Sequence, residues 1–182
     1  GLGRAVQAQM SHEWWAVKSR TWAIAPAAVI FVADQLTKWI VSGPLRLQEV
    51  GQIVVLPIFN LTWTENRGIS LGLLTADGEL GRWLLVAMTG AIAGAIAWWI
   101  THEHKRWDQL ALGLVLGGAM GNILDRVRFG YVVDFADLHF GDFRPFLVFN
   151  VADAAISIGV VILLLRAFLV KPKAPEETID HA

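Results

Sequence analysis

Four long apolar stretches limit how this chain can fold more than any other feature. They cover about residues 22–41, 82–100, 109–124 and 146–170. A helix needs about 20 mostly apolar residues to cross a bilayer. Of the 182 residues, 55% are hydrophobic and 17% are charged, so the apolar share exceeds that of ordinary soluble domains. The sequence therefore predicts an all-α membrane protein, a bundle of four transmembrane helices.

Two of these spans carry glycines at four-residue spacing, a pattern that lets helix backbones approach closely. Gly113, Gly117 and Gly121 lie in the third span, which we expect to be the central helix. Gly90 and Gly94 repeat the spacing in the second span, which has almost no other polar residue and is expected to act as scaffold. We interpret these glycines as packing devices.

The orientation of the bundle follows from the residues at the span ends. Lys and Arg flank the spans more closely on the side of both termini, which favours a cytoplasmic location for that side. Tryptophans also gather at the span ends, as interfacial residues do. We therefore expect both termini in the cytoplasm and two long connections on the outer side.

The two outer connections contain short runs rich in β-branched and aromatic residues. QIVVLPIF begins at Gln52, NLTWTEN begins at Asn60 and YVVDFADL begins at Tyr131. Such runs favour β-strands. We expect a small sheet, a cradle on the outer membrane surface, with loops around it.

The ends of the chain are expected to lie outside the fold. Residues 1–9 precede Met10 and lack an initiator, so we interpret them as a cloning remnant. Residues 10–173 are predicted to form a single membrane domain and residues 174–182 a cytoplasmic tail. The first apolar stretch is too long for a signal-peptide core, and we expect it to remain as an anchor.

Charge and cysteine content exclude several classes of function. The formal net charge is −1 and no long basic run is present, so we expect no nucleic acid partner. The chain has no cysteine, which excludes a disulfide framework, a thiolate zinc site and a cysteine nucleophile.

Polar and ionisable residues inside the spans converge near the outer surface. They come late in the first and third spans and early in the fourth, so in a bundle of alternating direction they meet in one leaflet. Within each group the spacing is three or four residues, which places the group on one helix face. Ionisable residues in spans are usually functional. The groups are Asp34 with Lys38, Asn122 with Asp125 and Arg126, and Asn150 with Asp153.

Two carboxyl groups held close together can share a proton, because like charges cannot both ionise cheaply. Such a pair can activate water and protonate a substrate carbonyl, which is aspartyl protease chemistry. Spacing alone does not choose the pair, although Asp153 stands out because it lies in an apolar span. The candidate acids are Asp34, Asp125, Asp134, Asp137, Asp142 and Asp153.

Other chemistries are weaker candidates. His139 lies close to Asp137 and Asp142 in the sequence, but no H-E-x-x-H motif occurs and we expect no metal or cofactor. A pairing of Ser70 with Lys38 is equally unsupported. The main alternative is a small proton- or ion-coupled transporter, because buried charges also mark ion pathways. Against it, we expect the polar residues not to continue to the cytoplasmic side, and no inverted repeat is visible. A non-catalytic assembly factor would explain the glycines but not the acids.

Five sequence blocks together resemble the lipoprotein signal peptidases, also called signal peptidase II. They stand in the order of that family and cover nearly the whole chain after Met10. Each block alone is a weak signal, but the conjunction is specific. The blocks are ADQLTKWI from Ala33, PIFNLTWTENRG from Pro57, GGAMGNILDR from Gly117, GYVVDFAD from Gly130 and FNVADAAISIG from Phe149.

The resemblance implies that Asp134 and Asp153 are the catalytic pair. It also implies site support and substrate positioning by eight residues, although structural ion pairs remain an alternative for Asp34 with Lys38 and for Asp125 with Arg126. The eight are Asp34, Lys38, Asn66, Asn122, Asp125, Arg126, Asn150 and Ala152. The chain departs from the usual family pattern after Asn66, where Ile69, Ser70 and Leu71 precede Gly72, which concerns loop packing rather than chemistry.

The resemblance further implies an aspartic endopeptidase of the bacterial inner membrane, multi-pass and with its active site facing the periplasm. Its substrate would be a prolipoprotein whose cysteine carries diacylglycerol, cut just before that cysteine. No metal or cofactor would take part. Membrane lipid and the peptide antibiotics that inhibit the family would be partners, and we expect a monomer.

Overall fold

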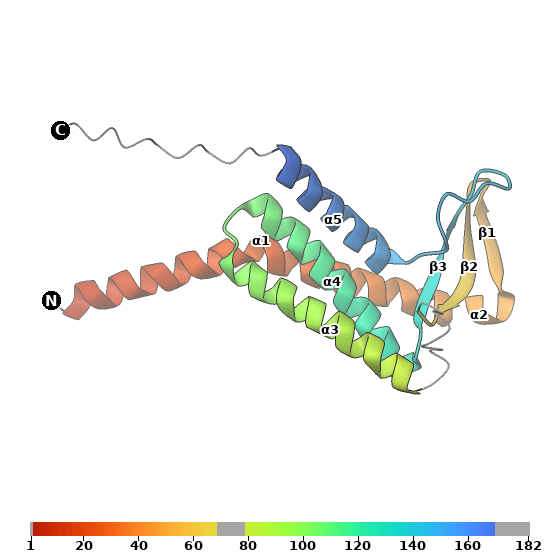
Figure 1. Ribbon diagram of the computed structural model, residues 1–182, viewed down its shortest axis with the longest axis horizontal. Coiled ribbons are helices and arrows are strands. Elements are labelled where there is room, and N and C mark those ends of the chain that lie inside the picture. The colour runs from red at the N-terminus through yellow and green to blue at the C-terminus, as the bar shows by residue number, and fades with distance from the viewer. Residues whose placement is uncertain (1, 69–78, 170–182) are drawn as a thin grey trace.

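Four helices are long and apolar enough to cross a membrane, as the sequence predicts (Figure 1). The computed structural model describes the backbone of residues 2–68 and 79–169 and the side chains from Arg20 onward. The helices are α1 (Leu2–Ser42), α3 (Glu79–His102), α4 (Arg106–Phe129) and α5 (Val151–Leu169). The chain is therefore a multi-pass membrane protein.

The helix ends differ from the apolar stretches. Helices α3 and α4 begin earlier and end later, because polar residues at their ends continue the backbone hydrogen bonding. Helix α5 begins at Val151 rather than near residue 146, because Phe149 is held in extended pairing with Ala136 and the chain turns helical only after Asn150. Helix α1 includes residues 2–9, the expected remnant. The expected tail at residues 174–182 and the departure at residues 69–72 lie outside the described residues.

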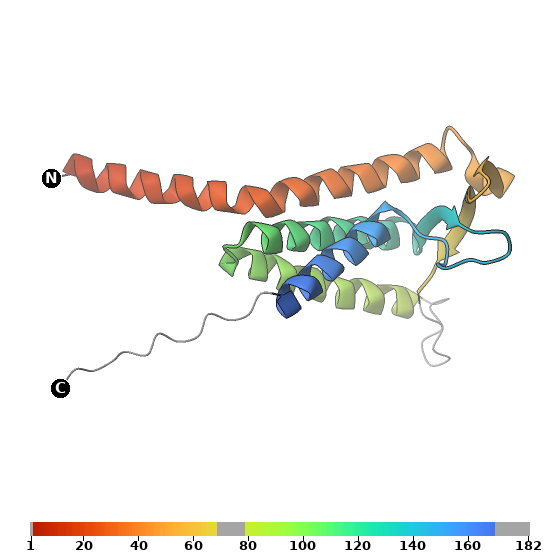
Figure 2. The same ribbon diagram turned by 90° about the horizontal axis from the view of Figure 1, so that it is seen from above.

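Helix α4 is the centre of the bundle, as the glycine spacing predicts. It contacts α1, α3 and α5, and Figures 1 and 2 show it running between α1 and α3. Half of its apolar window (50%) is buried inside the protein, against 11–17% for the other spans. The other three helices therefore present most of their apolar surface outward.

The glycines of α4 allow this central packing. A Cβ on Gly113 would lie 2.3 Å from the carbonyl oxygen of Ala23, and one on Gly117 would lie 2.4 Å from that of Ala27. These distances leave no room for a side chain, so the α1 and α4 backbones touch. On the other side of α4, Gly118 meets Ala152 in the same way, and Gly159 of α5 meets Ala111. The four-residue glycine spacing does not predict the contacts of Gly118 and Gly159.

The close packing expected at Gly90 and Gly94 of the second span is wrong. A Cβ added at Gly90 or Gly94 would meet no atom within 4 Å among the described residues. Both glycines lie on the outer side of α3, where spacing alone does not reveal which face meets another helix. Helix α3 packs on α4 through other residues, including the buried Ala93 and Ile100.

The expected sheet is present at one end of the bundle (Figure 1). After the short helix α2 (Leu47–Val50), the strands β1 (Gln52–Leu56), β2 (Phe59–Asn66) and β3 (Val132–Leu138) pair antiparallel in that order. A cluster of buried side chains joins the sheet to the end of α1. It contains Val41, Leu47, Val133, Phe135 and Ala136.

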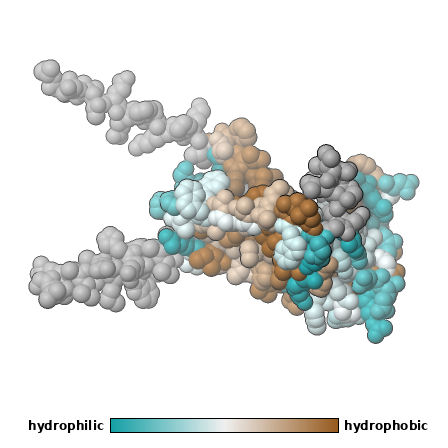
Figure 3. Space-filling view, turned by 60° about the horizontal axis from the view of Figure 1, so that its bottom comes forward, coloured by the Kyte–Doolittle hydropathy of each residue, from teal (hydrophilic) through white to brown (hydrophobic). Residues whose placement is uncertain are grey.

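The outer surface of the helices suits a bilayer. Large apolar side chains are widely exposed on it, among them Val29, Trp39 and Trp98. Figure 3 shows hydrophobic residues between two more hydrophilic ends of the molecule. Since exposed apolar surface of this extent is unfavourable in water, the bundle is built for lipid.

Candidate active site

Asp134 lies in the middle of β3, opposite Thr64 of β2. Its neighbours Val133 and Phe135 pack into the cluster beneath the sheet, and side chains alternate along a strand, so Asp134 points to the other face. There its carboxyl group is buried and accepts hydrogen bonds from Asn66 Nδ2 at 3.0 Å and Asn150 Nδ2 at 2.6 Å.

Asp153 lies in the first turn of α5 and is half-buried. Its backbone N–H donates to Asn150 Oδ1 at 2.9 Å, and the backbone N–H of Asn150 donates back to Asp153 Oδ2 at 3.3 Å. This reciprocal pair is a capping box, which satisfies two backbone donors at the start of the helix. The other oxygen, Oδ1, accepts a hydrogen bond from Asn122 Nδ2 at 2.9 Å.

Asn150 connects the two acids. Its side chain bonds to the Asp134 carboxyl group through Nδ2 and to the backbone of Asp153 through Oδ1. The same Nδ2 group also lies 3.2 Å from Asn122 Oδ1. The strand acid and the helix acid are therefore held by one short chain of amide side chains.

The ionised form of the Asp134 carboxyl group is unfavourable at this buried position. Burial, and after it the nearby Asp153 carboxylate, raise the pKa of the Asp134 carboxyl group to about 7, although hydrogen bonds from Asn66 and Asn150 oppose the shift. A carboxyl group with such a pKa carries a proton for much of the time near neutral pH. Two acids in this arrangement can hold one proton between them and so supply an acid and a base together.

A buried ion cluster lies beside the two acids. Lys38 Nζ is 2.8 Å from Asp34 Oδ2, 2.7 Å from Asp125 Oδ2 and 3.2 Å from Asn122 Oδ1. These three acceptors match the three donors of an ammonium group. Because all the charges are buried and paired, the cluster fixes α1 against α4 and reaches the site through Asn122.

The two cluster acids also hold the elements that carry Asp134 and Asp153. Asp34 Oδ1 accepts the backbone N–H of Ala152 at 3.0 Å, and Asp125 Oδ2 accepts the backbone N–H of Val133 at 3.1 Å. Each of these donors immediately precedes one of the two acids in the chain. A Cβ on Gly121 would lie 2.5 Å from Asp34 Oδ2, so this glycine makes room for the cluster.

Sequence reasoning missed Gln35. Its amide Nε2 donates to Asp125 Oδ1 at 3.0 Å and lies 3.2 Å from Asp34 Oδ2 and 3.3 Å from the Gly121 carbonyl oxygen. A glutamine within an apolar span was a signal for this role. Gln35 directly follows Asp34, so the four-residue spacing that pairs Asp34 with Lys38 does not include it.

Arg126 lies at the same level on α4, near three acids. Its guanidinium interacts electrostatically with Asp153, Asp134 and Asp125. Its Nε is buried and has no hydrogen-bond partner in the part of the chain that the structure describes. Its carbonyl oxygen accepts the Nε–H of Arg82 at 2.7 Å, which ties the end of α4 to α3. Unlike Lys38, this cation is left with a free donor.

The other candidate residues lie apart from this group. Asp137 accepts a hydrogen bond from Thr62 Oγ1 at 3.1 Å and pairs with Arg144, 3.3 Å away. Neither Asp137 nor Asp142 joins His139 in a metal-binding group, and no cluster of three such side chains occurs within residues 20–68 and 79–169. Ser70 lies outside the described residues.

The expectation that polar residues do not continue toward the other end of the bundle is wrong. There, Asp108 of α4 pairs with Arg166 of α5, and the neighbouring Gln109 is fully buried with its Nε2 donating to the Glu103 carbonyl oxygen at 2.7 Å. The sequence does not predict this group, because its members lie near the ends of the apolar stretches, where charged residues are common.

Comparisons with known proteins identify the family of this chain. Residues 26–169 match the model of the family described as signal peptidase (SPase) II. A lipoprotein signal peptidase of Sphingopyxis alaskensis is 60% identical over 148 residues, which are 81% of this chain and 86% of that protein. One of Rhizorhabdus wittichii is 56% identical over 155 residues, 85% of this chain and 90% of that protein.

A solved structure shows the same fold. This bacterial membrane enzyme, determined in meso at 1.9 Å resolution, superposes with a TM-score of 0.69 at 30% sequence identity, over 83% of this chain and 94% of that one. These comparisons do not support the alternative of a small proton- or ion-coupled transporter. The chain belongs to the signal peptidase II family, the lipoprotein signal peptidases, and is an aspartic peptidase of that family.

Proposed function

We propose that Asp134 and Asp153 are the catalytic pair of this peptidase. The observation that carries the proposal is that Asn150 forms hydrogen bonds with both residues. Its side chain donates to the Asp134 carboxyl group, and it forms the capping box with Asp153. The pKa of Asp134 near 7 supports a division of labour, because it favours a shared proton on Asp134.

In the proposed mechanism, protonated Asp134 donates a hydrogen bond to the scissile carbonyl oxygen. The Asp153 carboxylate takes a proton from water, and the resulting hydroxide adds to the carbonyl carbon as Asp134 gives its proton to the oxygen. Asp153 then passes its proton to the leaving nitrogen, the C–N bond breaks, and Asp134 regains its proton from the hydroxyl group of the intermediate. One water is consumed and both acids end as they began.

We propose a prolipoprotein substrate whose cysteine carries diacylglycerol, cut just before that cysteine. The relatives carry the name lipoprotein signal peptidase, which supports the substrate class. A groove of about 280 Å³ beside Asp153 supports a lipidated substrate, because its walls are mainly apolar and lie where acyl chains would pass. It is lined by Phe146, Phe149, Asp153, Ala154, Ser157 and Ile158.

The supporting residues are proposed to divide into two groups. Asn66, Asn122 and Asn150 orient the carboxyl groups, since each donates a hydrogen bond to one of them. Lys38, with Asp34 and Asp125, positions the backbone of β3 and α5, which includes Ala152. Arg126, which is half-buried beside both acids, would contact substrate with its guanidinium group, most simply at a backbone carbonyl near the cleaved bond.

We place the protein in the bacterial inner membrane with both termini cytoplasmic and the site toward the periplasm. The sheet, whose strand β3 carries Asp134, lies at the same end of the bundle as the start of α5, which carries Asp153, and this supports access from a single side (Figure 1). Residues 10–173 form the proposed catalytic domain, acting as a monomer in contact with membrane lipid. The family's peptide antibiotics would compete with substrate at the acid pair.

The experiment is cleavage of a diacylated prolipoprotein by purified protein in detergent. Asp134→Asn and Asp153→Asn are each expected to lower kcat by at least about 1,000-fold, because each removes the acid or the base. Asp137→Asn is the matched control: it changes a buried acid on the same strand that is bonded to Thr62 rather than to the pair. We expect this control to retain most activity.

Two results would contradict the proposal. Substantial cleavage by either substituted protein would remove that residue from the chemistry. Equal cleavage of an unlipidated prolipoprotein would leave the acid pair in place but refute the requirement for diacylglycerol.

A further inference from the structure

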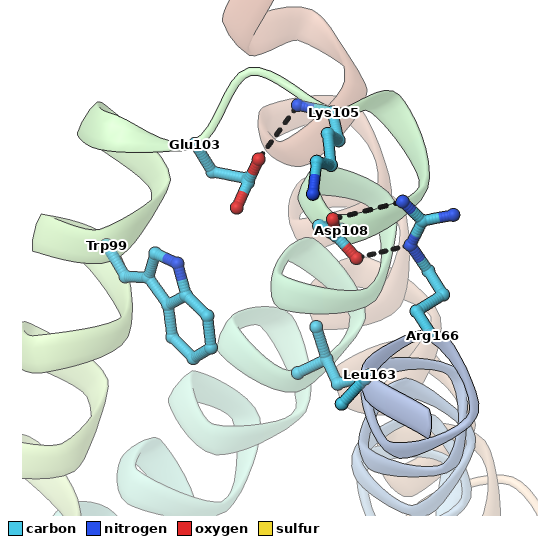
Figure 4. Close-up of a pocket in the computed structure, with 7 residues that line it drawn as sticks. Trp99, Glu103, Lys105, Asp108, Leu163 and Arg166 are labelled. Atoms are coloured by element: carbon cyan, nitrogen blue, oxygen red, sulfur yellow. Dashed lines mark hydrogen bonds and ion pairs between the residues drawn. The ribbon is translucent and has the colours of Figure 1, made fainter. Parts of the chain in front are cut away.

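A second cavity lies at the end of the bundle opposite the sheet. Its volume is about 270 Å³, and it is enclosed by the end of α3, the turn into α4 and the last turn of α5. Figure 4 shows the side chains around a common space, with the Trp99 indole on one side and Arg166 on the other. The residues are Trp99, Glu103, Lys105, Asp108, Leu163 and Arg166.

Two of the four charges in this cavity neutralise each other. Arg166 donates from Nε and Nη2 to the two oxygens of Asp108, a bidentate pair that Figure 4 marks with dashed lines. Such a planar pair holds both partners in a fixed geometry. It forms a rigid wall of the cavity and leaves little net charge there.

The other two charges are incompletely paired. Glu103 Oε1 accepts the backbone N–H groups of His104 and Lys105, each at 2.9 Å, and its Oε2 receives no hydrogen bond from the described residues. Lys105 Nζ has no hydrogen-bond or ion-pair partner in the described parts of the chain. The cavity therefore offers one carboxylate oxygen and one ammonium group, close together on the same turn.

The position of the cavity matches the headgroup layer of a bilayer. Helices α3 and α4 have 24 residues each, which corresponds to about 36 Å, whereas the hydrocarbon core is about 30 Å thick. Their ends thus reach the polar region. Trp99 and Leu163 add an apolar wall on the side toward the membrane interior, and tryptophan favours this depth.

We propose that this cavity binds the headgroup of a zwitterionic phospholipid with a primary ammonium group, phosphatidylethanolamine. Its phosphate would pair with Lys105, its ammonium would donate to the free oxygen of Glu103, and its glycerol backbone would lie against Trp99 and Leu163. This site is separate from the acid pair, and the proposal does not depend on the peptidase mechanism.

The same features argue against other lipids. A trimethylammonium headgroup has no N–H to donate to Glu103 and is usually held by several aromatic rings, whereas Trp99 is the one aromatic residue among the described residues that line this cavity. An anionic glycerol headgroup would bring net negative charge beside Glu103 and Asp108, and it has no ammonium group of its own to donate to Glu103.

The test is native mass spectrometry of the full chain in detergent with one added phospholipid at a time. The three lipids share the same acyl chains and carry ethanolamine, choline or glycerol headgroups. We expect the ethanolamine lipid to bind about tenfold more tightly than the choline lipid, since charge-assisted hydrogen bonds distinguish them. The glycerol lipid is expected to bind no better than the choline lipid.

Three variants separate the two contacts. Glu103→Gln keeps the acceptor for the two backbone N–H groups but removes the charge, so it is expected to abolish the preference for ethanolamine. Lys105→Ala is expected to weaken both zwitterionic lipids. Arg106→Ala is the matched control, because the neighbouring Arg106 stacks over Trp22 instead of lining the cavity, and it is expected to bind like wild type. Unchanged prolipoprotein cleavage by each variant verifies that it is folded.

The proposal is overturned if the wild-type chain binds the ethanolamine and choline lipids equally, or binds the glycerol lipid best. It is also overturned if Glu103→Gln keeps the wild-type preference. An equal loss in Arg106→Ala and Lys105→Ala would show attraction to general surface charge rather than to this cavity.

Discussion

At the scale of single residues, the site combines an acid whose charge is unfavourable with cations that are used in different ways. Asp134 is buried and has a raised pKa, whereas all three donors of the Lys38 ammonium group are paired with buried acceptors. Arg126 keeps a donor free beside the same acids. These differences lead to separate expectations for stability and for substrate binding.

Asp134 should make the protein less stable as the pH rises. Its pKa is about 7 in the folded protein against an ordinary value of 3.8, so the proton binds more tightly in the folded state. The stabilisation is fully present below about pH 4 and is lost as the pH rises to about 7. The difference of about three pKa units corresponds to at most about 4 kcal/mol.

The measurement is thermal unfolding in detergent at about pH 5 and about pH 8. The melting temperature of the wild type is expected to fall over this range by more than that of Asp134→Asn, which lacks the titrating group. Asp142→Asn makes the same chemical change at an exposed loop position and should keep the wild-type pH dependence. An unaltered pH dependence in Asp134→Asn would contradict the raised pKa.

Arg126→Ala is expected to raise KM for the lipidated substrate and to lower kcat/KM by roughly 10- to 100-fold, because a donor to substrate is lost. Removing this cation also raises the pKa of Asp134 by charge. The fall of kcat/KM at high pH should therefore move to higher pH, which loss of packing alone would not cause. Arg128→Ala is the control, since Arg128 is exposed on the same helix and stacks on Phe129. Equal effects of both substitutions would refute a substrate contact.

The proposed acid pair could be predicted only in part from single residues. Depth within an apolar span marks Asp153, but Asp134 and Asp137 lie three residues apart on one strand and both are buried. They differ in the residues that contact them. Asp134 accepts hydrogen bonds from Asn66 and Asn150, whereas Asp137 contacts Thr62 and Arg144. Only the family resemblance distinguishes them in advance.

At the scale of elements, the bundle depends on which face of each helix meets another. Gly117→Ala places a methyl group 2.4 Å from a backbone oxygen of α1, which cannot move away as a flexible side chain could. We expect a loss of about 1–3 kcal/mol in the free energy of unfolding and lower activity. The measurement is the melting temperature in detergent.

Gly94→Ala is the matched control on α3, where an added Cβ meets nothing within 4 Å among the described residues. Its melting temperature is expected to equal or exceed that of the wild type, because alanine favours helix more than glycine. Similar destabilisation by the two substitutions would show that close packing is not what separates these glycines. Both have identical sequence spacing, so only the structure distinguishes them.

The start of α5 shows why element boundaries are hard to predict. Phe146 and Leu147 continue the apolar run of the fourth span, yet the helix begins at Val151. Backbone pairing between Phe149 and Ala136 and the cap at Asn150 decide the boundary. Hydropathy detects neither, because both depend on a strand that is distant in the sequence.

At the scale of the whole molecule, the absence of cysteine makes the orientation directly testable. Asp142→Cys places one thiol in the loop near the sheet, and His104→Cys places one at the opposite end, both at exposed positions. A thiol reagent that cannot cross the inner membrane is expected to label the first in spheroplasts and the second only after permeabilisation. The reverse pattern would place the catalytic end in the cytoplasm.

The number of spans, the central helix and the sheet were predictable because they rest on long patterns of apolar residues and strand-forming runs. The polar group at the far end was not. Asp108 and Arg166 lie 58 residues apart, each at the end of an apolar stretch, and nothing in the sequence pairs them. Contacts between helix ends depend on helix length and packing, which composition does not fix.

The capping box at Asn150 couples the proposed role of Asp153 in catalysis to local folding at the start of α5. Asp153 Oδ2 accepts a backbone hydrogen bond that helps to begin α5, so a substrate that draws this oxygen away also loosens the first turn of the helix. Conversely, a ligand that leaves this hydrogen bond intact does not destabilise the first turn of α5 and binds more favourably by that free energy. In the proposed mechanism, where Asp153 is the base, the stability of the first turn of α5 therefore contributes to the free energy of every complex in which a ligand binds Asp153 Oδ2.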